Sequence, residues 1–343
     1  MKALVLQGYN DFVYKDVDDP TIKAHEVLVG VEACGICGSD VHGMDGSTGR
    51  RKPPVIMGHE AAGIIVDVGN RVSEWKKGDR VTFDSTIYCG TCWYCKKGKI
   101  NLCDNRQVLG VSCDDYKRDG AFAEFVAVPQ HILYSIPESV SFVDASMIET
   151  ISIALHSINR VAVSINDTAV VIGAGMIGLL IIQLLKINGC KSVIAVDINP
   201  LNTEKSLSLG ADHAFISGKD NVLEEIKKIS AGRGADVAFE AVGLTESVQL
   251  AINSVRKDGL VSVVGNISPS VEIPLQNLVT RELSFFGSCA SQGEYETAID
   301  LLASKRIDTN PLISATAPLS EGGSWFKRLY LKEDNLLKVV LVP

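Results

Sequence analysis

A turn near the middle of the chain restricts its fold more than any other feature. Gly173, Gly175 and Gly178 form a G-x-G-x-x-G pattern between the apolar segments TAVVI and IGLLIIQLLKI. Such a turn joins a buried strand to a helix whose N-terminal N–H groups favour a pyrophosphate. Asp197 ends the next apolar segment, SVIAVD, at the position where an acidic residue binds the ribose hydroxyls and disfavours a 2′-phosphate.

The turn therefore predicts a dinucleotide site that prefers NAD to NADP. The alternative is a tight strand–helix turn followed by a solvated aspartate. The predicted cofactor-binding residues are Gly173, Gly175, Met176, Ile177, Gly178 and Asp197.

The surrounding pattern predicts an α/β fold. From about residue 167 to 288, apolar strand-like segments alternate with helix-like segments, as in a parallel sheet covered on both faces. Residues 1–150 contain short Val- and Gly-rich segments between turns and predict an irregular β-rich domain. A helix-like segment and a terminal strand follow in 289–343. We expect three segments, 1–150, 151–288 and 289–343.

Composition excludes several functions. The 343 residues carry a formal net charge of −8, so no basic field favours nucleic acid or anionic lipid, and a nucleic-acid-binding zinc ribbon is disfavoured. The longest apolar stretch is too short for a membrane span, and the N-terminus resembles a first strand rather than a signal peptide. We expect a soluble cytoplasmic protein that binds neither nucleic acid nor membrane.

Four cysteines lie within fifteen residues in the segment CGTCWYCKKGKINLC. Four thiolates at this spacing can surround one Zn²⁺ and leave no open coordination position, so the site would be structural. An iron–sulfur cluster is possible in principle, but the Cys-Pro typical of bacterial ferredoxins is missing. Unliganded thiols are the remaining alternative. The predicted ligands are Cys89, Cys92, Cys95 and Cys103.

Other ligand-type residues lie outside this loop, and together they supply a thiolate, an imidazole and carboxylates. This donor set suits an open, catalytic zinc. Each residue alone is weak evidence, because a single His, Ser or Glu more often has a structural role. Cys34 and Cys37 could also form a redox dithiol. The candidate catalytic residues are Cys37, Ser39, His42, His59, Glu60 and Glu149.

The segments GICGSDVH, GHEAAG, the C-x2-C-x2-C-x7-C loop and VVIGAGMIG occur in this order along the whole chain. In this respect the chain resembles the zinc-dependent medium-chain alcohol dehydrogenases. The resemblance implies a GroES-like catalytic domain built from both chain ends and a Rossmann coenzyme domain between them. It also implies an NAD-dependent enzyme with two zinc ions per chain.

By motif position, the resemblance makes Cys37 and His59 catalytic zinc ligands and Glu60 a ligand or near-ligand. It assigns Ser39 and His42 to a proton relay. Cys34 is then a small buried residue rather than half of a dithiol. The four cysteines of the loop hold the structural zinc.

The fourth ligand position separates the branches of the family. Here it is Glu149, which resembles the sorbitol, threonine and galactitol-1-phosphate dehydrogenases, although Thr150 follows it where their pattern usually has proline. We expect oxidation of a secondary alcohol of a polyol, a sugar alcohol or its phosphate to the ketone. L-Threonine or 2,3-butanediol oxidation is the near alternative, and a non-enzymatic zinc and nucleotide sensor is the distant one.

Two further segments bear on partners. The segment Leu283–Ser288 resembles the family's subunit-joining edge strand, so we expect a homodimer or homotetramer. Arg50, Arg51 and Lys52 lie in a polar loop and could bind a sugar phosphate, since arginine pairs bidentately with phosphate. The alternative is a solvated basic loop.

Overall fold

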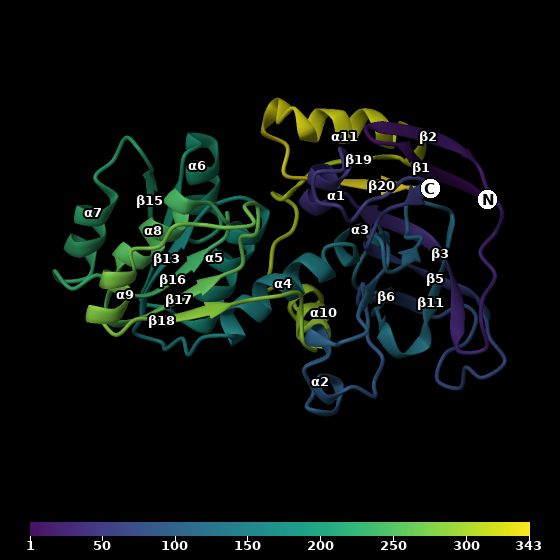
Figure 1. Cartoon of the computed structure of the whole chain (residues 1–343), viewed down its shortest axis with the longest axis horizontal. Coiled ribbons are helices and arrows are strands. Elements are labelled where there is room, and N and C mark those ends of the chain that lie inside the picture. Colours follow the sequence, from purple (N-terminus) through teal and green to yellow (C-terminus); the bar gives the residue numbers. More distant parts are fainter. The chain divides into compact units, whose positions relative to one another are not determined.

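The structure, a computed structural model, describes all 343 residues and divides into two compact units. One unit contains both ends of the chain, Met1–Thr150 and Tyr295–Pro343. The other contains the middle, Ile151–Glu294. Figure 1 shows the first in purple, blue and yellow and the second mostly in teal and green.

The unit made from both chain ends is rich in short strands. Its N-terminal elements are β1 (Lys2–Gly8), β2 (Asp11–Asp16), β3 (Glu26–Gly35), α1 (Gly38–Gly43), β4 (Val55–Ile56), β5 (Glu60–Val68), β6 (Arg80–Phe83), β7 (Thr86–Ile87), α2 (Trp93–Lys96), β8 (Gln107–Val108), β9 (Val111–Ser112), β10 (Lys117–Arg118), β11 (Phe125–Pro129), β12 (Leu133–Ser135) and α3 (Phe142–Ala145). Its C-terminal elements are α10 (Tyr295–Ala303), β19 (Ile313–Pro318), α11 (Gly322–Tyr330) and β20 (Lys338–Val342).

Strand β3 organises this unit. It pairs antiparallel with β5, with β11 and with the last strand, β20. Strand β19 lies parallel to β20, so the end of the chain completes a seven-stranded sheet begun by the N-terminal segment. Alternate residues of β3, β11 and β20 belong to a common core, as expected for strands with one face toward it: Val27, Val29, Val31, Val126, Val128, Val339 and Leu341.

Aromatic side chains close that core. Phe326 of α11 is fully buried, with its ring centroid 4.3 Å from that of Phe12 and 5.6 Å from that of Phe122. Such contacts add to the free energy gained by burying the rings. Helix α11 is therefore held on the N-terminal strands by packing.

The middle unit consists of alternating strands and helices. They are β13 (Thr168–Ile172), α5 (Met176–Asn188), β14 (Ser192–Asp197), α6 (Pro200–Ser208), β15 (His213–Ile216), α7 (Val222–Ile229), β16 (Ala235–Glu240), α8 (Thr245–Ser254), β17 (Val255–Val263), α9 (Leu275–Thr280) and β18 (Ser284–Gly287). Helix α4 (Ile148–Asn159) begins in the first unit and ends in this one.

All six strands of the middle unit run parallel, in the order β15-β14-β13-β16-β17-β18. Helices cover both faces of the sheet, which explains why its strands are apolar throughout (Figure 1). The order reverses direction between β13 and β16, and a ligand crevice is expected at the carboxyl ends of the strands there. The presence of a Rossmann unit and a β-rich unit confirms the predicted fold class.

The second boundary between the units lies six residues later than the sequence pattern suggested, at Glu294 rather than after Ser288. The carboxylate of Glu294 holds this segment in the middle unit. Its Oε1 accepts hydrogen bonds from His156 Nδ1 at 2.9 Å and Asn159 Nδ2 at 3.1 Å. Such a long-range contact leaves no trace in local periodicity.

No helix in the structure combines the length and hydrophobicity that a membrane crossing requires. The apolar helix α5 is instead buried against the parallel sheet.

We expect Leu341→Ala in β20 to destabilise the first unit by about 2–5 kcal/mol, because a fully buried leucine leaves a cavity when truncated. Leu331→Ala removes a side chain that is 55% exposed and should change stability by less than about 0.5 kcal/mol. Urea unfolding followed by tryptophan fluorescence measures this unit alone. All three tryptophans belong to it: Trp75, Trp93 and Trp325. Equal midpoints for the two variants would contradict the role of β20 as a core strand.

Candidate functional site

Two neighbouring strand ends bring three candidate ligands together. Strand β3 ends at Gly35, which is paired directly with Glu60, the first residue of β5. Cys37 follows the end of β3, and His59 directly precedes the start of β5. The side chains of Cys37, His59 and Glu60 therefore lie close together at this end of the strand pair. The Cys37 sulfur, a His59 ring nitrogen and a Glu60 oxygen lie within 4.8 Å of one another.

Glu60 is held by two hydrogen bonds. Its Oε1 accepts one from the Thr150 hydroxyl at 3.0 Å, and its Oε2 accepts one from Lys338 Nζ at 2.5 Å. Lys338 is buried at the start of β20. Burial alone would lower the pKa of Lys338, but the negative charges of Glu60 and Cys37 outweigh it and raise that pKa. The lysine is therefore a charged partner of the carboxylate.

His59 faces a second buried carboxylate. Its Nδ1 lies 3.3 Å from Asp40 Oδ2, although neither atom has a hydrogen bond of good geometry, so the contact is an electrostatic one. Burial would raise the pKa of Asp40, but His59 and Arg51 hold it well below its usual range. Burial would lower the pKa of His59, but Asp40 and Cys37 raise it well above its usual value.

The residues present fit a zinc ion. A thiolate, an imidazole and a carboxylate are zinc donors, and a catalytic site uses three protein ligands plus an exchangeable one. The raised pKa values of His59 and Lys338 are caused by the acidic groups around them, Asp40 and Cys37 for His59 and Glu60 and Cys37 for Lys338, and such surroundings favour a cation. The contact of Asp40 with Nδ1 leaves the other ring nitrogen of His59 for a metal, as is usual for a ligand histidine.

Ser39 and His42 lie on the short helix α1, directly after Cys37. The Ser39 hydroxyl donates to the Cys37 sulfur at 3.3 Å, and both Ser39 and His42 are exposed. Residues three apart share one face of a helix. The two exposed side chains therefore share the face of α1 that begins next to Cys37.

Glu149, in the first turn of α4, lies outside the group of three ligand atoms. Its carboxyl group is close enough to affect them electrostatically. Burial raises the pKa of Glu149 to about 7, reinforced by Glu60 and Asp84 and opposed by His59 and Lys338. The structure thus brings Cys37, His59 and Glu60 together and places Glu149 near them.

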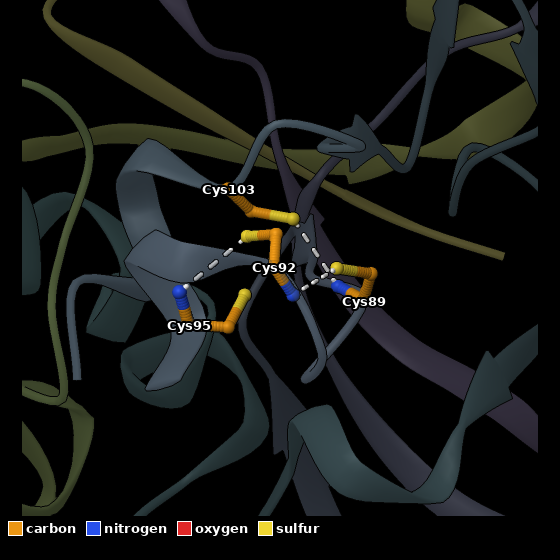
Figure 2. Close-up of side chains that lie close together, drawn as sticks. All are labelled: Cys89, Cys92, Cys95 and Cys103. Carbon is orange, nitrogen blue, oxygen red and sulfur yellow. Dashed lines mark hydrogen bonds between the residues drawn. The ribbon is translucent and has the colours of Figure 1, made fainter. Parts of the chain in front are cut away.

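The four cysteines of the second cluster converge in a small lobe around α2 (Figure 2). Their sulfurs lie within 4.8 Å of one another. Backbone N–H groups of the cysteines themselves donate to these sulfurs, Cys89 to Cys103 at 3.2 Å, Cys92 to Cys89 at 3.3 Å and Cys95 to Cys92 at 3.5 Å. Zn–S bonds of about 2.3 Å in a tetrahedron give S···S separations near 3.8 Å, which matches a mononuclear site.

The cysteine pKa values also fit a cation at this cluster. Hydrogen bonds from Thr91 and from the Cys92 N–H lower the pKa of Cys89 to about 5. Burial and the neighbouring thiols raise the pKa of Cys95 to about 12. Four adjacent thiolates repel one another, and a divalent cation removes that penalty.

The glycine-rich loop lies at the carboxyl end of β13. Gly173 has φ +90°, a left-handed conformation that favours glycine, and α5 starts at Met176. A side chain at Gly178 would overlap the Gly173 carbonyl oxygen, whereas one at Gly175 would meet nothing within 4 Å. The third glycine therefore serves helix–strand packing, and the second leaves space for a ligand.

Asp197 ends β14, beside this loop. Its Oδ2 accepts the Ala174 N–H at 2.7 Å and its Oδ1 accepts the Asn199 N–H at 2.8 Å. Each carboxylate oxygen retains a lone pair. The carboxylate is thus fixed at the predicted position and can still accept ribose hydroxyls. Met176 and Ile177 are half-buried in the first turn of α5.

Sequence reasoning did not identify the partners that hold the ligands. Asp40 lies inside the quoted GSDVH segment, and Lys338 is the one charged residue of the terminal segment LLKVVLVP. A lysine in an otherwise apolar strand signals a buried ion pair. Thr150 differs from the family pattern, and its sequence position alone does not indicate the hydrogen bond that it donates to Glu60.

The environment of the basic residues 50–52 also differs from both expectations. Arg51 is buried and forms an ion pair with Asp40 at 2.7 Å, and Lys52 pairs with Asp114. For Arg51, both a phosphate-binding role and a solvated one are wrong, because its guanidinium group lies inside the protein. Arg50 is exposed.

The fold and these clusters define a zinc-binding, dinucleotide-dependent dehydrogenase. Residues 23–138 match the alcohol dehydrogenase GroES-like domain, and residues 177–304 match the zinc-binding dehydrogenase domain. The chain is 34% identical to sorbitol dehydrogenase of Bacillus subtilis over 348 aligned positions, covering 100% of this chain and 97% of that protein.

Two solved structures are also similar over the full length. Galactitol-1-phosphate dehydrogenase from Escherichia coli matches with TM-score 0.93 and 28% identity, covering 100% of both chains. A zinc-binding dehydrogenase from Sinorhizobium meliloti, bound to NADP, matches with TM-score 0.92 and 31% identity, covering 100% of this chain and 99% of that one. The chain belongs to the zinc-dependent medium-chain alcohol dehydrogenases, in their polyol dehydrogenase branch.

Gly178→Ala should destabilise the middle unit by about 1–3 kcal/mol, because the added methyl group overlaps backbone. Gly175→Ala should leave stability nearly unchanged and weaken NADH binding. Thermal unfolding by circular dichroism and titration with NADH would separate the two effects. Equal stability of both variants would contradict the packing role of Gly178.

Proposed function

We propose that this enzyme oxidises a secondary hydroxyl of a polyol or sugar alcohol to the ketone, with NAD as the hydride acceptor. The cluster of Cys37, His59 and Glu60 carries the proposal. It combines one thiolate with a carboxylate, and a second carboxyl group, Glu149, lies nearby. A metal in such a set is harder than one held by two thiolates and favours chelation by a diol.

The proposed ligand sets follow from the same geometry. Cys37, His59 and Glu60 would hold the catalytic zinc, with Glu149 bound directly or through water. The second zinc would stabilise the lobe that contains α2. Its ligands would be Cys89, Cys92, Cys95 and Cys103.

When bound, zinc acidifies the substrate hydroxyl and NAD accepts the hydride from its carbon, so one proton must leave for each alcohol oxidised. Ser39 would accept that proton, and its exposed hydroxyl, 3.3 Å from the Cys37 sulfur, supports this role. His42 shares its helix face and can transfer the proton to solvent. Asp197 would orient the cofactor through its ribose.

An unphosphorylated substrate is better supported than a sugar phosphate. A phosphate requires one or more cations at its site. Of the three cations in the loop 50–52, Arg51 is buried against Asp40 and Lys52 pairs with Asp114. Arg50 is the only one of the three that does not pair with a carboxylate, which favours a neutral polyol.

We further propose that two copies of the chain associate through β18. This strand is at one edge of the six-stranded sheet, and Phe285 on it is 40% exposed. An exposed apolar edge strand is usually covered, and pairing with a second copy would cover it. The nine free cysteines are compatible with the reducing cytoplasm as the compartment.

The first test is a substrate panel with NAD and NADP on the zinc-loaded enzyme. We expect the highest kcat/KM for a polyol such as sorbitol with NAD, and Cys37→Ala should lower kcat by at least about 1000-fold because one metal ligand is lost. The buried Cys34→Ala is the matched control for the loss of a thiol, and it should keep most of the activity.

Fast turnover of L-threonine or 2,3-butanediol without polyol oxidation would contradict the proposed substrate class and identify that compound as the substrate. Binding of two zinc ions and NADH without turnover of any alcohol or ketone would support a sensor instead. Full activity of a folded Cys37→Ala variant would remove Cys37 from the site.

The four-cysteine cluster has its own test. Cys95→Ser should reduce zinc content from two ions per chain to one and make the lobe sensitive to proteolysis, because the lobe has little core of its own. Cys113→Ser, a half-buried cysteine outside both clusters, should retain two zinc ions. Elemental analysis and limited proteolysis measure these effects. An unchanged zinc content in Cys95→Ser would contradict the proposed ligand set.

A further inference from the structure

Arg51 is a charged side chain enclosed beside the catalytic cluster. Only 4% of it is exposed, although it belongs to a polar loop. Its Nε and Nη2 both donate to Asp40 Oδ1, at 2.9 and 2.7 Å, and its Nη1 donates to the Arg50 carbonyl oxygen at 3.0 Å. The guanidinium group is thus held in one orientation by the protein.

The fold leaves room for this arginine. A Cβ atom at Gly43, the last residue of α1, would lie 2.7 Å from Arg51 Cγ and 3.2 Å from Thr48 Oγ1. No side chain fits between the helix and the arginine stem. Residue 51 also forms an isolated β-bridge with Ser112, which fixes its backbone. The position is therefore built around the arginine.

Through Asp40, the arginine reaches one proposed metal ligand. Asp40 is 0% exposed, and its other oxygen, Oδ2, lies 3.3 Å from His59 Nδ1. Because Arg51 binds Oδ1 through two nitrogens, the carboxylate cannot rotate without losing both hydrogen bonds. Its orientation in turn sets the face that His59 presents to a metal.

Through Ser39, the arginine reaches a second proposed metal ligand, Cys37. Arg51 Nη2 lies 3.5 Å from Ser39 Oγ, and this hydroxyl donates to the Cys37 sulfur at 3.3 Å. One nitrogen thus contacts both Asp40 and Ser39. Lysine cannot reproduce this arrangement, since a single ammonium group lacks the planar fork of donors.

We propose that Arg51 is a positioning residue that sets the geometry of the catalytic metal site, acting on His59 through Asp40 and on Cys37 through Ser39. This inference rests on the proposed function, in which Cys37 and His59 are ligands of the catalytic zinc. A merely structural Arg51 would neutralise the buried Asp40 and leave the metal geometry unaffected.

The test compares Arg51→Lys with Arg50→Lys, which makes the same change on an adjacent exposed side chain. Three quantities are measured on the purified full chain: the absorption spectrum after cobalt(II) substitution, the rate of zinc release to a chelator, and kcat and KM. Cys37→Ala identifies the catalytic-site component of the spectrum and of zinc release.

In Arg51→Lys we expect a shifted cobalt spectrum, and zinc release and kcat should change by about 10- to 100-fold. KM for NAD should stay within about twofold, since the substitution leaves the middle unit intact. Arg50→Lys should match the wild type in all three. A folded Arg51→Lys protein with wild-type spectrum and zinc release would overturn the proposal, even if its thermal stability fell.

If Arg51→Lys does not fold, Gly43→Ala decides the question, because it crowds the arginine stem and keeps every charge. A shifted cobalt spectrum in Gly43→Ala would support the proposal, and a wild-type spectrum would overturn it. Failure of the proposed function gives a different result. In that case Cys37→Ala would retain both zinc ions and the complete cobalt spectrum.

Discussion

The catalytic cluster depends on negative charge that is buried and individually compensated. Asp40 and Glu60 are 0% and 1% exposed, and a buried carboxylate without a partner costs several kcal/mol. Each therefore has its own buried cation, Arg51 for Asp40 and Lys338 for Glu60. One cation comes from the loop after α1 and the other from the first residue of β20. The first unit must bring both chain ends together before this charge can be enclosed.

These ion pairs matter for orientation more than for net stability. Replacing a buried pair by apolar residues is often neutral, whereas removing one partner costs about 3–5 kcal/mol. What a pair adds is direction, because hydrogen bonds restrict how a carboxylate can turn. Asp40 and Glu60 are each held on one oxygen by a cation. Asp40 therefore faces His59 in a fixed orientation, and Glu60 has a fixed orientation beside Cys37 and His59. The ligand cluster is therefore preorganised by residues that are not themselves proposed metal ligands.

The parts of the protein that could be predicted are those whose information is local. Four cysteines within fifteen residues specify their own cluster, and the glycine-rich turn is defined by the strand and helix on either side of it. The strands and helices of the Rossmann unit follow from apolar periodicity. Strand β15 is the exception, because its segment, HAFI, is partly exposed and too short to show a period.

The residues that could not be predicted act over long sequence separations. Lys338 meets Glu60 across 278 positions, and Thr150 meets it across 90. Arg51 is only 11 positions from Asp40, yet its pairing depends on how α1 turns the chain and on the missing side chain at Gly43. A basic residue in a polar loop has the same local pattern whether it is solvated or buried, and only the fold distinguishes the two.

Thr150 shows how one such contact changes the meaning of a sequence difference. In the family pattern that the sequence resembles, proline follows the glutamate that corresponds to Glu149, and proline would restrict the local backbone. Threonine gives up that restriction and supplies a hydroxyl, which donates to Glu60 Oε1 at 3.0 Å while Lys338 holds Oε2. Glu60 is thereby fixed from two sides beside Cys37 and His59. Glu149 lies outside the group of three ligand atoms. At position 150 this chain therefore has a hydrogen bond that orients Glu60 in place of a restriction on the backbone after Glu149.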